Sequence, residues 1–202
     1  ALAGFLEKSF MTGINMNEAL SDPVVGPPIV SHIGETISKI AARNSSGFNI
    51  FIDEAANLLQ NEGFRTSVKE MFREYRKLNG MVGLAFQDPS ALHASEIASA
   101  VIENVSTLIF FPNTLGKKQD YEPFNLNDEQ LEFILSGCAT GNNRRVLLVK
   151  REASTGFEES VILNIDLSHL GDALRFYRSG PDAVEHLKHI QDQWGDQWQS
   201  HL

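Results

Sequence analysis

The sequence lacks several features that would assign it to a class at once. It has one cysteine, Cys138, so no internal disulfide can form, which fits a reducing compartment. No apolar stretch approaches the roughly 18–20 residues that a membrane-spanning helix needs, and we expect no signal peptide. Basic residues are also scarce, since 17 Lys and Arg stand against 26 Asp and Glu. The net charge of −9 argues against a free-standing nucleic-acid-binding domain, which normally needs a basic face.

The clearest positive feature is the segment Phe-Asn-Ile-Phe-Ile-Asp-Glu at residues 48–54. Its apolar run is typical of a parallel strand, and we expect helices to cover both faces of that strand. Acids that follow such a strand lie at the carboxyl edge of the sheet, where open α/β sheets bind ligands. The pattern is that of a Walker B strand, in which Asp53 would hold Mg²⁺ through water and Glu54 would orient the attacking water. Alternatively, both acids only cap and charge the next helix.

A phosphate-binding loop to match this strand is missing from the sequence. No GxxxxGK[ST] motif occurs, and the nearest match, Gly116-Lys117-Lys118, has no glycine at the required upstream position. The chain also starts at Ala1 rather than at a methionine. A Walker B strand without a phosphate-binding loop indicates either a fragment of a longer protein or a degenerate hydrolase.

Hydrophobic periodicity predicts alternating helices and strands in one large domain, or in a domain with an appendage. Helices are expected at about 29–43, 55–78, 91–105, 127–136 and 181–194, and strands at 48–52, 81–86, 107–111, 146–150 and 160–165. Ser90 is the expected cap of the third helix, and Asn127 with Gln130 is typical of a capping box. Alternating strands and helices predict a parallel α/β sheet, and the last two strands predict an antiparallel hairpin that extends it.

Polar residues follow the first three expected strands: Asp53 and Glu54, then Gln87, then Asn113. If the strands are parallel, these residues share one edge of the sheet. A RecA-like ATPase needs this arrangement, with a metal-binding acid and a catalytic Glu on one strand and a polar sensor of the γ-phosphate on its neighbour. Asn113 is then a candidate nucleotide contact. For Gln87 alone, the simpler interpretation is a polar residue that caps the turn before Pro89.

Five ordered blocks resemble the VirB-type ATPases (VirB-four, TrbE and CagE) of type IV secretion systems. The blocks lie at 49–55, 76–89, 97–104, 109–113 and 144–150, and a matching ending runs from 166 to 180. The resemblance covers nearly the whole chain. It implies part of one RecA-like P-loop NTPase domain downstream of the phosphate-binding loop: a lead-in (1–28), a Walker B core (29–113), and C-terminal strands and helices (114–202). This chain alone should then be inactive.

The resemblance further implies an ATPase that uses ATP and Mg²⁺ and works as an oligomer, commonly a hexamer. It would lie at the cytoplasmic face of the inner membrane with other type IV secretion components and energise pilus assembly and substrate transfer. By position, Asp53 matches the Walker B acid, Glu54 the catalytic Glu and Gln87 a sensor-like Gln. Arg144 and Arg145 match arginines near the nucleotide of a neighbouring subunit, where a guanidinium can neutralise charge on the transferred phosphoryl group.

Some interpretations stay open at this stage. Arg144 and Arg145 can equally be solvated residues leading into a strand, and the sequence does not choose between the two as a finger. The sequence departs from the family at Ala56, where Trp is frequent, and at Phe86 and Asp88, which flank the Gln. A coupling protein or DNA translocase with the same RecA-like fold is one alternative function, and it should bind DNA in a salt-sensitive way. A scaffold that keeps the acids without catalysis is another.

Overall fold

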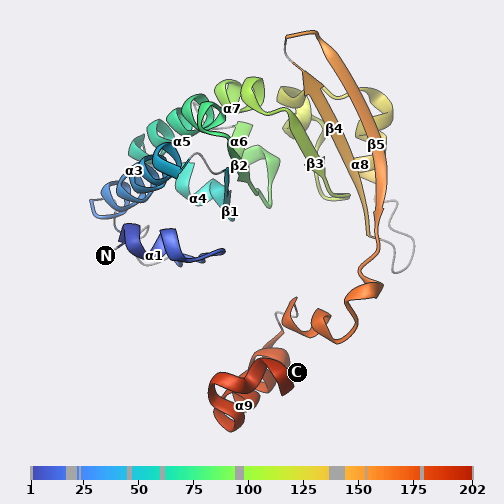
Figure 1. Cartoon of the computed structure of the whole chain (residues 1–202). Helices are drawn as coiled ribbons and strands as arrows, with labels where there is room; N and C mark the ends of the chain where they lie inside the picture. The colour runs from blue at the N-terminus through green and yellow to red at the C-terminus, as the bar shows by residue number, and fades with distance from the viewer. Residues whose placement is uncertain are drawn as a thin grey trace.

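Two small sheets and the helices packed on them make up most of the structure, which is a computed structural model (Figure 1). It describes residues 2–16, 22, 24–44, 47–59, 62–93, 98–136, 144–152, 154–177 and 180–201. Cys138 therefore lies outside the described residues, as do Ile97 and Gly137, which were expected in and after helices.

The elements follow the expected alternation of helices and strands. The α-helices are α1 (Leu2–Lys8), α3 (Gly26–Asn44), α4 (Ala55–Leu59), α5 (Glu62–Glu74), α6 (Pro89–His93), α7 (Ala98–Asn104), α8 (Asp128–Ser136) and α9 (Pro181–Trp194). The 3-10 helices are η1 (Tyr75–Leu78), η2 (Lys118–Phe124), η3 (Ser168–Tyr177) and η4 (Gly195–His201). The strands are β1 (Phe48–Ile52), β2 (Gly80–Leu84), β3 (Thr107–Phe110), β4 (Arg144–Glu152) and β5 (Phe157–Ile165).

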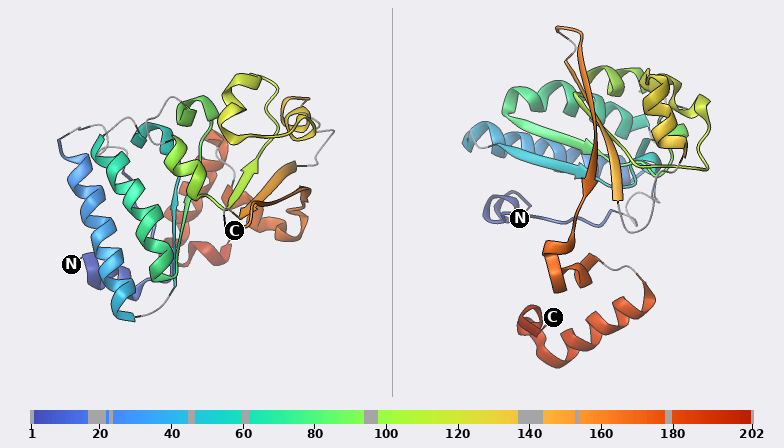
Figure 2. Two further views of the ribbon diagram at one scale, coloured as in Figure 1. Left: turned by 90° about the horizontal axis from the view of Figure 1, so that it is seen from above. Right: turned by 90° about the vertical axis from the view of Figure 1, so that its right-hand side faces the viewer.

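The first sheet contains β1 and β2, which pair in parallel from Phe48 opposite Gly80 to Ile52 opposite Leu84. Helices α3 and α5 lie on one side of this pair (Figure 2). Alternate residues of β1 are therefore half-buried, whereas Phe51 on the other face is 73% exposed. The expectation that helices cover both faces of β1 is wrong, because the described helices that pack on this sheet form one layer. The apolar run Phe-Asn-Ile-Phe-Ile thus has one buried face and one open face.

The second sheet has the order β3-β4-β5, and both of its pairings are antiparallel. The expected hairpin is confirmed, but it extends β3 rather than the parallel pair. The prediction that β3 continues the parallel sheet is also wrong. Thr107 to Phe110 pair with Lys150 to Leu147, which places Leu108 and Phe110 on the same buried face as Leu147. Antiparallel pairing with a longer apolar strand therefore satisfies the backbone of β3 and buries its side chains together.

The two sheets share one hydrophobic core. Phe64 and Val68 of α5 belong to the same buried cluster as Ile134 of α8 and Val149 of β4, and Leu84 of β2 packs against it. Phe64 and Val68 lie one helical turn apart on the stripe that the sequence predicted for α5. The cluster fixes the carboxyl ends of β2 and β3 in one body.

Two helix starts illustrate local sequence signals. At α8 the capping box is confirmed, since the Asn127 backbone N–H donates to Gln130 Oε1 and the Gln130 N–H donates to Asn127 Oδ1, both at 2.9 Å. At α6 the predicted cap Ser90 is wrong. The helix starts at Pro89, so Asp88 occupies the cap position and its Oδ1 accepts the Ser90 N–H at 2.9 Å.

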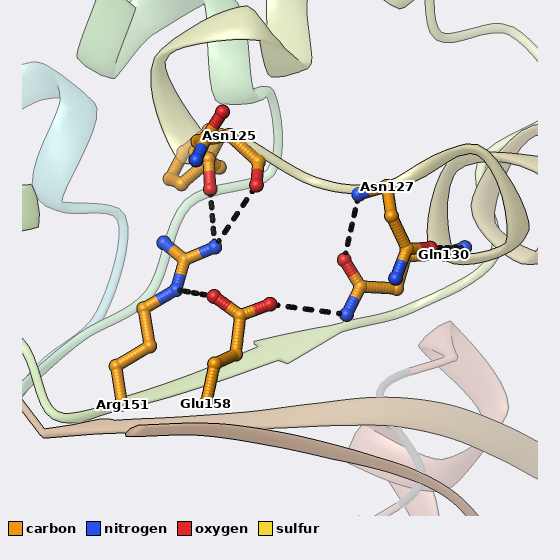
Figure 3. A network of polar contacts seen from close by, with 6 residues as sticks. Asn125, Asn127, Gln130, Arg151 and Glu158 are labelled. Carbon is orange, nitrogen blue, oxygen red and sulfur yellow. Dashed lines mark hydrogen bonds and ion pairs between the residues drawn. The ribbon is translucent and has the colours of Figure 1, made fainter. Parts of the chain in front are cut away.

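A polar network ties the hairpin to η2 and α8 (Figure 3). Arg151 Nε donates to Glu158 Oε2 at 2.7 Å, and its Nη2 donates to the backbone carbonyls of Phe124 and Asn125. Gln130 Nε2 donates to the other oxygen of Glu158 at 3.4 Å. Each strong polar group in this partly buried region therefore has a partner, which fixes the hairpin against the end of η2.

The C-terminal elements α9 and η4 pack chiefly against each other and lie apart from the two sheets (Figures 1 and 2). Helix α9 starts at Pro181 and ends at Trp194, as predicted, with Gly180 at its N-cap. No helix in the described part of the chain is both long and apolar enough to cross a membrane.

Candidate functional site

The chain turns sharply between β1 and α4, at the two acids. Asp53 and Glu54 are both exposed, and the Glu54 N–H donates to Asp53 Oδ1 at 2.9 Å. Glu54 has φ 50°, in the left-handed region that a glutamate rarely adopts. Backbone bonds continue beyond the strands, from Ala85 N to Ile52 O at 2.9 Å and from Ala55 N to Ala85 O at 3.0 Å. The turn is thereby fixed to the segment that follows β2.

Gln87 reaches Glu54 across this edge. Its Nε2 donates to Glu54 Oε1 at 3.1 Å, so the polar residues that follow β1 and β2 meet, as parallel strands require. Asp88, rather than Gln87, caps the turn before Pro89. The simpler interpretation of Gln87 as a turn cap therefore does not describe its side chain, and the amide is available for a role at the edge.

Asn113 lies in the loop after β3, and among the described residues it makes no hydrogen bond to Glu54 or Gln87. Its backbone N–H donates to the carbonyl of Ile134 at 2.7 Å. Its side chain joins two neighbours: Nδ2 donates to the hydroxyl of Tyr121 at 3.2 Å, and Oδ1 accepts the Leu115 N–H at 3.2 Å. The third strand end is thus connected to η2 rather than directly to the first two.

Tyr121 links this loop to the segment after β2. Burial raises the pKa of the Tyr121 phenol above its usual 10.0, the hydrogen bond from Asn113 opposes that rise, and the charges of Asp120 and Asp88 add to it. Helix α6, which Asp88 caps, packs against η2. Tyr121 therefore lies within electrostatic range of the residue next to Gln87. No pattern in the sequence indicated a role for this tyrosine.

The two candidate arginines begin β4, at the end of the second sheet where β3 finishes. The guanidinium of Arg145 lies 5.8 Å from the centroid of the Phe133 ring, a cation–π distance. Arg144 is exposed and stands opposite Ile165. The structure thus gives the two arginines different surroundings, and neither contacts Glu54 in the described chain.

The donor set at the edge fits a weakly held Mg²⁺ rather than a metal caged by protein. Asp53 offers an exposed carboxylate, which suits an ion that keeps its waters and binds one or two carboxylates together with substrate phosphates. Within the described residues, no group of three or more His, Cys, Asp or Glu side chains could hold a metal ion. That statement includes His186 and His189, which are exposed on α9.

The fold and the edge define a mixed α/β protein in which an acid pair and an amide meet at the carboxyl ends of parallel strands. No protein-family model matches the chain. It is 26% identical over 197 residues to the type IV secretion system protein virB4 of Bartonella quintana, covering 96% of this chain and 24% of that protein. It is 29% identical over 150 residues to the Brucella suis virB4, covering 74% of this chain and 17% of that protein. A probable conjugal transfer protein TrbE of Sinorhizobium fredii is 25% identical over 178 residues, covering 86% of this chain and 25% of that protein.

These matches confirm the resemblance to the VirB4/TrbE family: the chain is a relative of type IV secretion proteins. It spans a quarter or less of the length of the three relatives. The roles of the individual residues at the edge stay predictions.

Proposed function

We propose that this chain is part of the ATP-hydrolysing motor of a type IV secretion or conjugation system, which powers pilus assembly and substrate transfer. The observation that carries the proposal is the hydrogen bond between Glu54 and Gln87 beside Asp53, at the carboxyl ends of parallel strands. Relatives named for type IV secretion and conjugal transfer support the same assignment.

In this proposal the three edge residues have separate tasks. Asp53 holds Mg²⁺ through water, and the ion would neutralise charge on the phosphates of ATP. Glu54 orients the attacking water, which requires its carboxylate to be held in a fixed direction. The left-handed backbone of Glu54 and the amide of Gln87 both set that direction. Gln87, which contacts Glu54 directly, would sense the state of the site.

The phosphate-binding loop would come from sequence outside this chain. The edge of β2 away from β1 and the edge of β3 away from β4 have no strand partner among the described residues. Both strands contribute to one core and carry polar residues just beyond their carboxyl ends. A strand that paired with either edge and ended in a glycine-rich loop would bring phosphate-binding amides to Asp53 and Gln87.

Assembly completes the proposal. An arginine of one subunit, Arg144 or Arg145, would act on the nucleotide of its neighbour in a homo-oligomer, for which a hexamer is the expected form. The assembly would work at the cytoplasmic face of the inner membrane with other secretion components.

The test is Mg²⁺-dependent ATP hydrolysis by the protein produced from the longest reading frame that contains this sequence. We expect Glu54→Gln to bind ATP and to lose turnover by a factor on the order of 10² or more, because the water-orienting carboxylate is gone. Glu132→Gln, an equal change at an exposed position of α8, is the matched control and should keep full activity.

Two results would contradict the motor. If the wild type does not hydrolyse ATP under assembly conditions, or if Glu54→Gln keeps full activity, the non-catalytic scaffold replaces it. Strong, salt-sensitive DNA binding by the intact oligomer would instead favour the coupling-protein alternative.

A further inference from the structure

The side-chain amide of Asn113 is held at both ends. Its Oδ1 accepts the backbone N–H of Leu115 and its Nδ2 donates to the Tyr121 hydroxyl, both at 3.2 Å. Because a backbone N–H can only donate, the first contact fixes which end of the amide is oxygen. Nδ2 carries two hydrogens, and Tyr121 takes one of them. The other is bonded to no residue in the described part of the chain.

The partner that fixes this amide is itself rigid. Tyr121 is 3% exposed and belongs to the hydrophobic core, where its ring meets Phe110 of β3 edge to face at 6.2 Å between centroids. Gly116 closes over the pair, since a Cβ built there would lie 3.0 Å from Asn113 Nδ2 and from the ring and hydroxyl of Tyr121. The loop can pass this closely only because residue 116 has no side chain.

The pair also lies on the side of the molecule where the strands end. Asn113 follows β3, and η2, which carries Tyr121, packs against α6, the helix that Asp88 caps directly after Gln87. The effect of Asp88 on the pKa of Tyr121 agrees with this placement. The free amide hydrogen of Asn113 is therefore a candidate donor on the edge that already carries Glu54 and Gln87.

We propose that Tyr121 is a positioning residue whose hydroxyl holds the Asn113 amide so that its remaining Nδ2 hydrogen is donated to a phosphate oxygen of the bound nucleotide. The inference rests on the proposed function, because it names a further part of the same site. A donor held in advance needs no reorganisation when the anionic ligand arrives. Removing the hydroxyl would free the amide to rotate without removing it, and the loss should fall on nucleotide binding.

The chain offers a matched control for this change. Tyr75 is also buried, at 4% exposed, and its hydroxyl donates to the carbonyl of Gly34 at 3.0 Å. It lies in η1, before the start of β2 and thus at the opposite end of that strand from Gln87. Tyr75→Phe therefore loses a hydroxyl in a similar setting but away from the strand ends.

The experiment compares Tyr121→Phe, Asn113→Ala, their double variant and Tyr75→Phe in the protein from the full reading frame. The Kd for ATP is measured on the Glu54→Gln background, and kcat and Tm on the wild-type background. We expect Tyr121→Phe and Asn113→Ala each to raise the Kd about fivefold to tenfold, with kcat within about twofold. The double variant should bind no worse than Asn113→Ala, because both changes remove one unit. Gly116→Ala should also raise the Kd, although the hydroxyl remains.

Tyr75→Phe should lower Tm and leave the Kd unchanged. If Tyr121→Phe behaves as Tyr75→Phe does, while Glu54→Gln still stops turnover, the hydroxyl is only structural; the inference is then overturned and the motor stands. If the wild type neither binds nor hydrolyses ATP, the proposed function fails and the inference falls with it.

Discussion

Glycine at position 54 should stabilise the protein relative to alanine, which reverses the usual order. Glu54 has φ 50°, and this left-handed conformation costs an L-residue roughly 1–2 kcal/mol that glycine does not incur. The greater freedom of glycine in the unfolded chain offsets about 0.5–1 kcal/mol. Both variants lose the hydrogen bond to Gln87, so that loss cancels in the comparison. Glu54→Gly should therefore be more stable than Glu54→Ala by about 0.5–1 kcal/mol.

The control is the same pair of substitutions at Glu70, an exposed residue in the interior of α5. There glycine should be less stable than alanine by about 1 kcal/mol. Urea denaturation followed by circular dichroism gives the free energy of unfolding of all four variants, and Tm should move by roughly 2–4 °C per kcal/mol in a chain of this size. If glycine is the less stable residue at both positions, Glu54 is not left-handed in solution, and the argument that its backbone aims the carboxylate fails.

Two further changes test the network and the cap. Arg151→Met should lower the free energy of unfolding by about 2–3 kcal/mol, because it strands two backbone carbonyls and the Glu158 carboxylate, whereas Lys118→Met, at an exposed ion pair, should cost under about 0.5 kcal/mol; equal losses in urea denaturation would contradict this ranking. Hydrogen bonds from Ser90 lower the pKa of Asp88 below its usual 3.8, so its charge stabilises the fold above that pH and the contribution disappears as pH falls through the lowered value. The stability difference between wild type and Asp88→Asn should therefore change only in this acidic range, and a difference independent of pH would refute the assignment.

Elements with signals inside a few residues were predictable from the sequence. The capping box of Asn127 and Gln130 is present as expected, and Asn79 ends η1 in the left-handed conformation that such residues tolerate. Pro181 opens α9, and the hairpin β4–β5 forms around its polar turn. Each of these outcomes depends on contacts between near neighbours, which the sequence displays directly.

The partner of β3 depends on contacts that the sequence does not display. Thr-Leu-Ile-Phe fits a parallel neighbour of β2 and an antiparallel neighbour of β4 equally well, because both would bury Leu108 and Phe110. The choice is made by the shape of the shared core. The open face of Phe51 has the same origin, since a short apolar run does not show how many helical layers cover it.

The candidate site was predictable in its strand-end chemistry and not in its supports. Parallel strands bring their ends together whatever their side chains, so the meeting of Glu54 and Gln87 followed from the order of strands. The left-handed backbone of Glu54 had no such signal, because that conformation is typical of Gly and Asn rather than Glu. Tyr121 had none either, since it reaches Asn113 from a 3-10 helix that no periodicity indicated.

The geometry of the edge is set by its backbone rather than by its side chains. The hydrogen bond between Glu54 and Gln87 joins two exposed residues, and a bond of that kind contributes little net stability. The backbone bonds of Ala85 to Ile52 and of Ala55 to Ala85 carry the pairing past both strands and hold the turn in place. Substituting Gln87 should therefore alter what the edge does while leaving where its acids lie unchanged. A loss of turnover in a Gln87 variant of normal stability would consequently report on the chemistry of the edge and not on its folding.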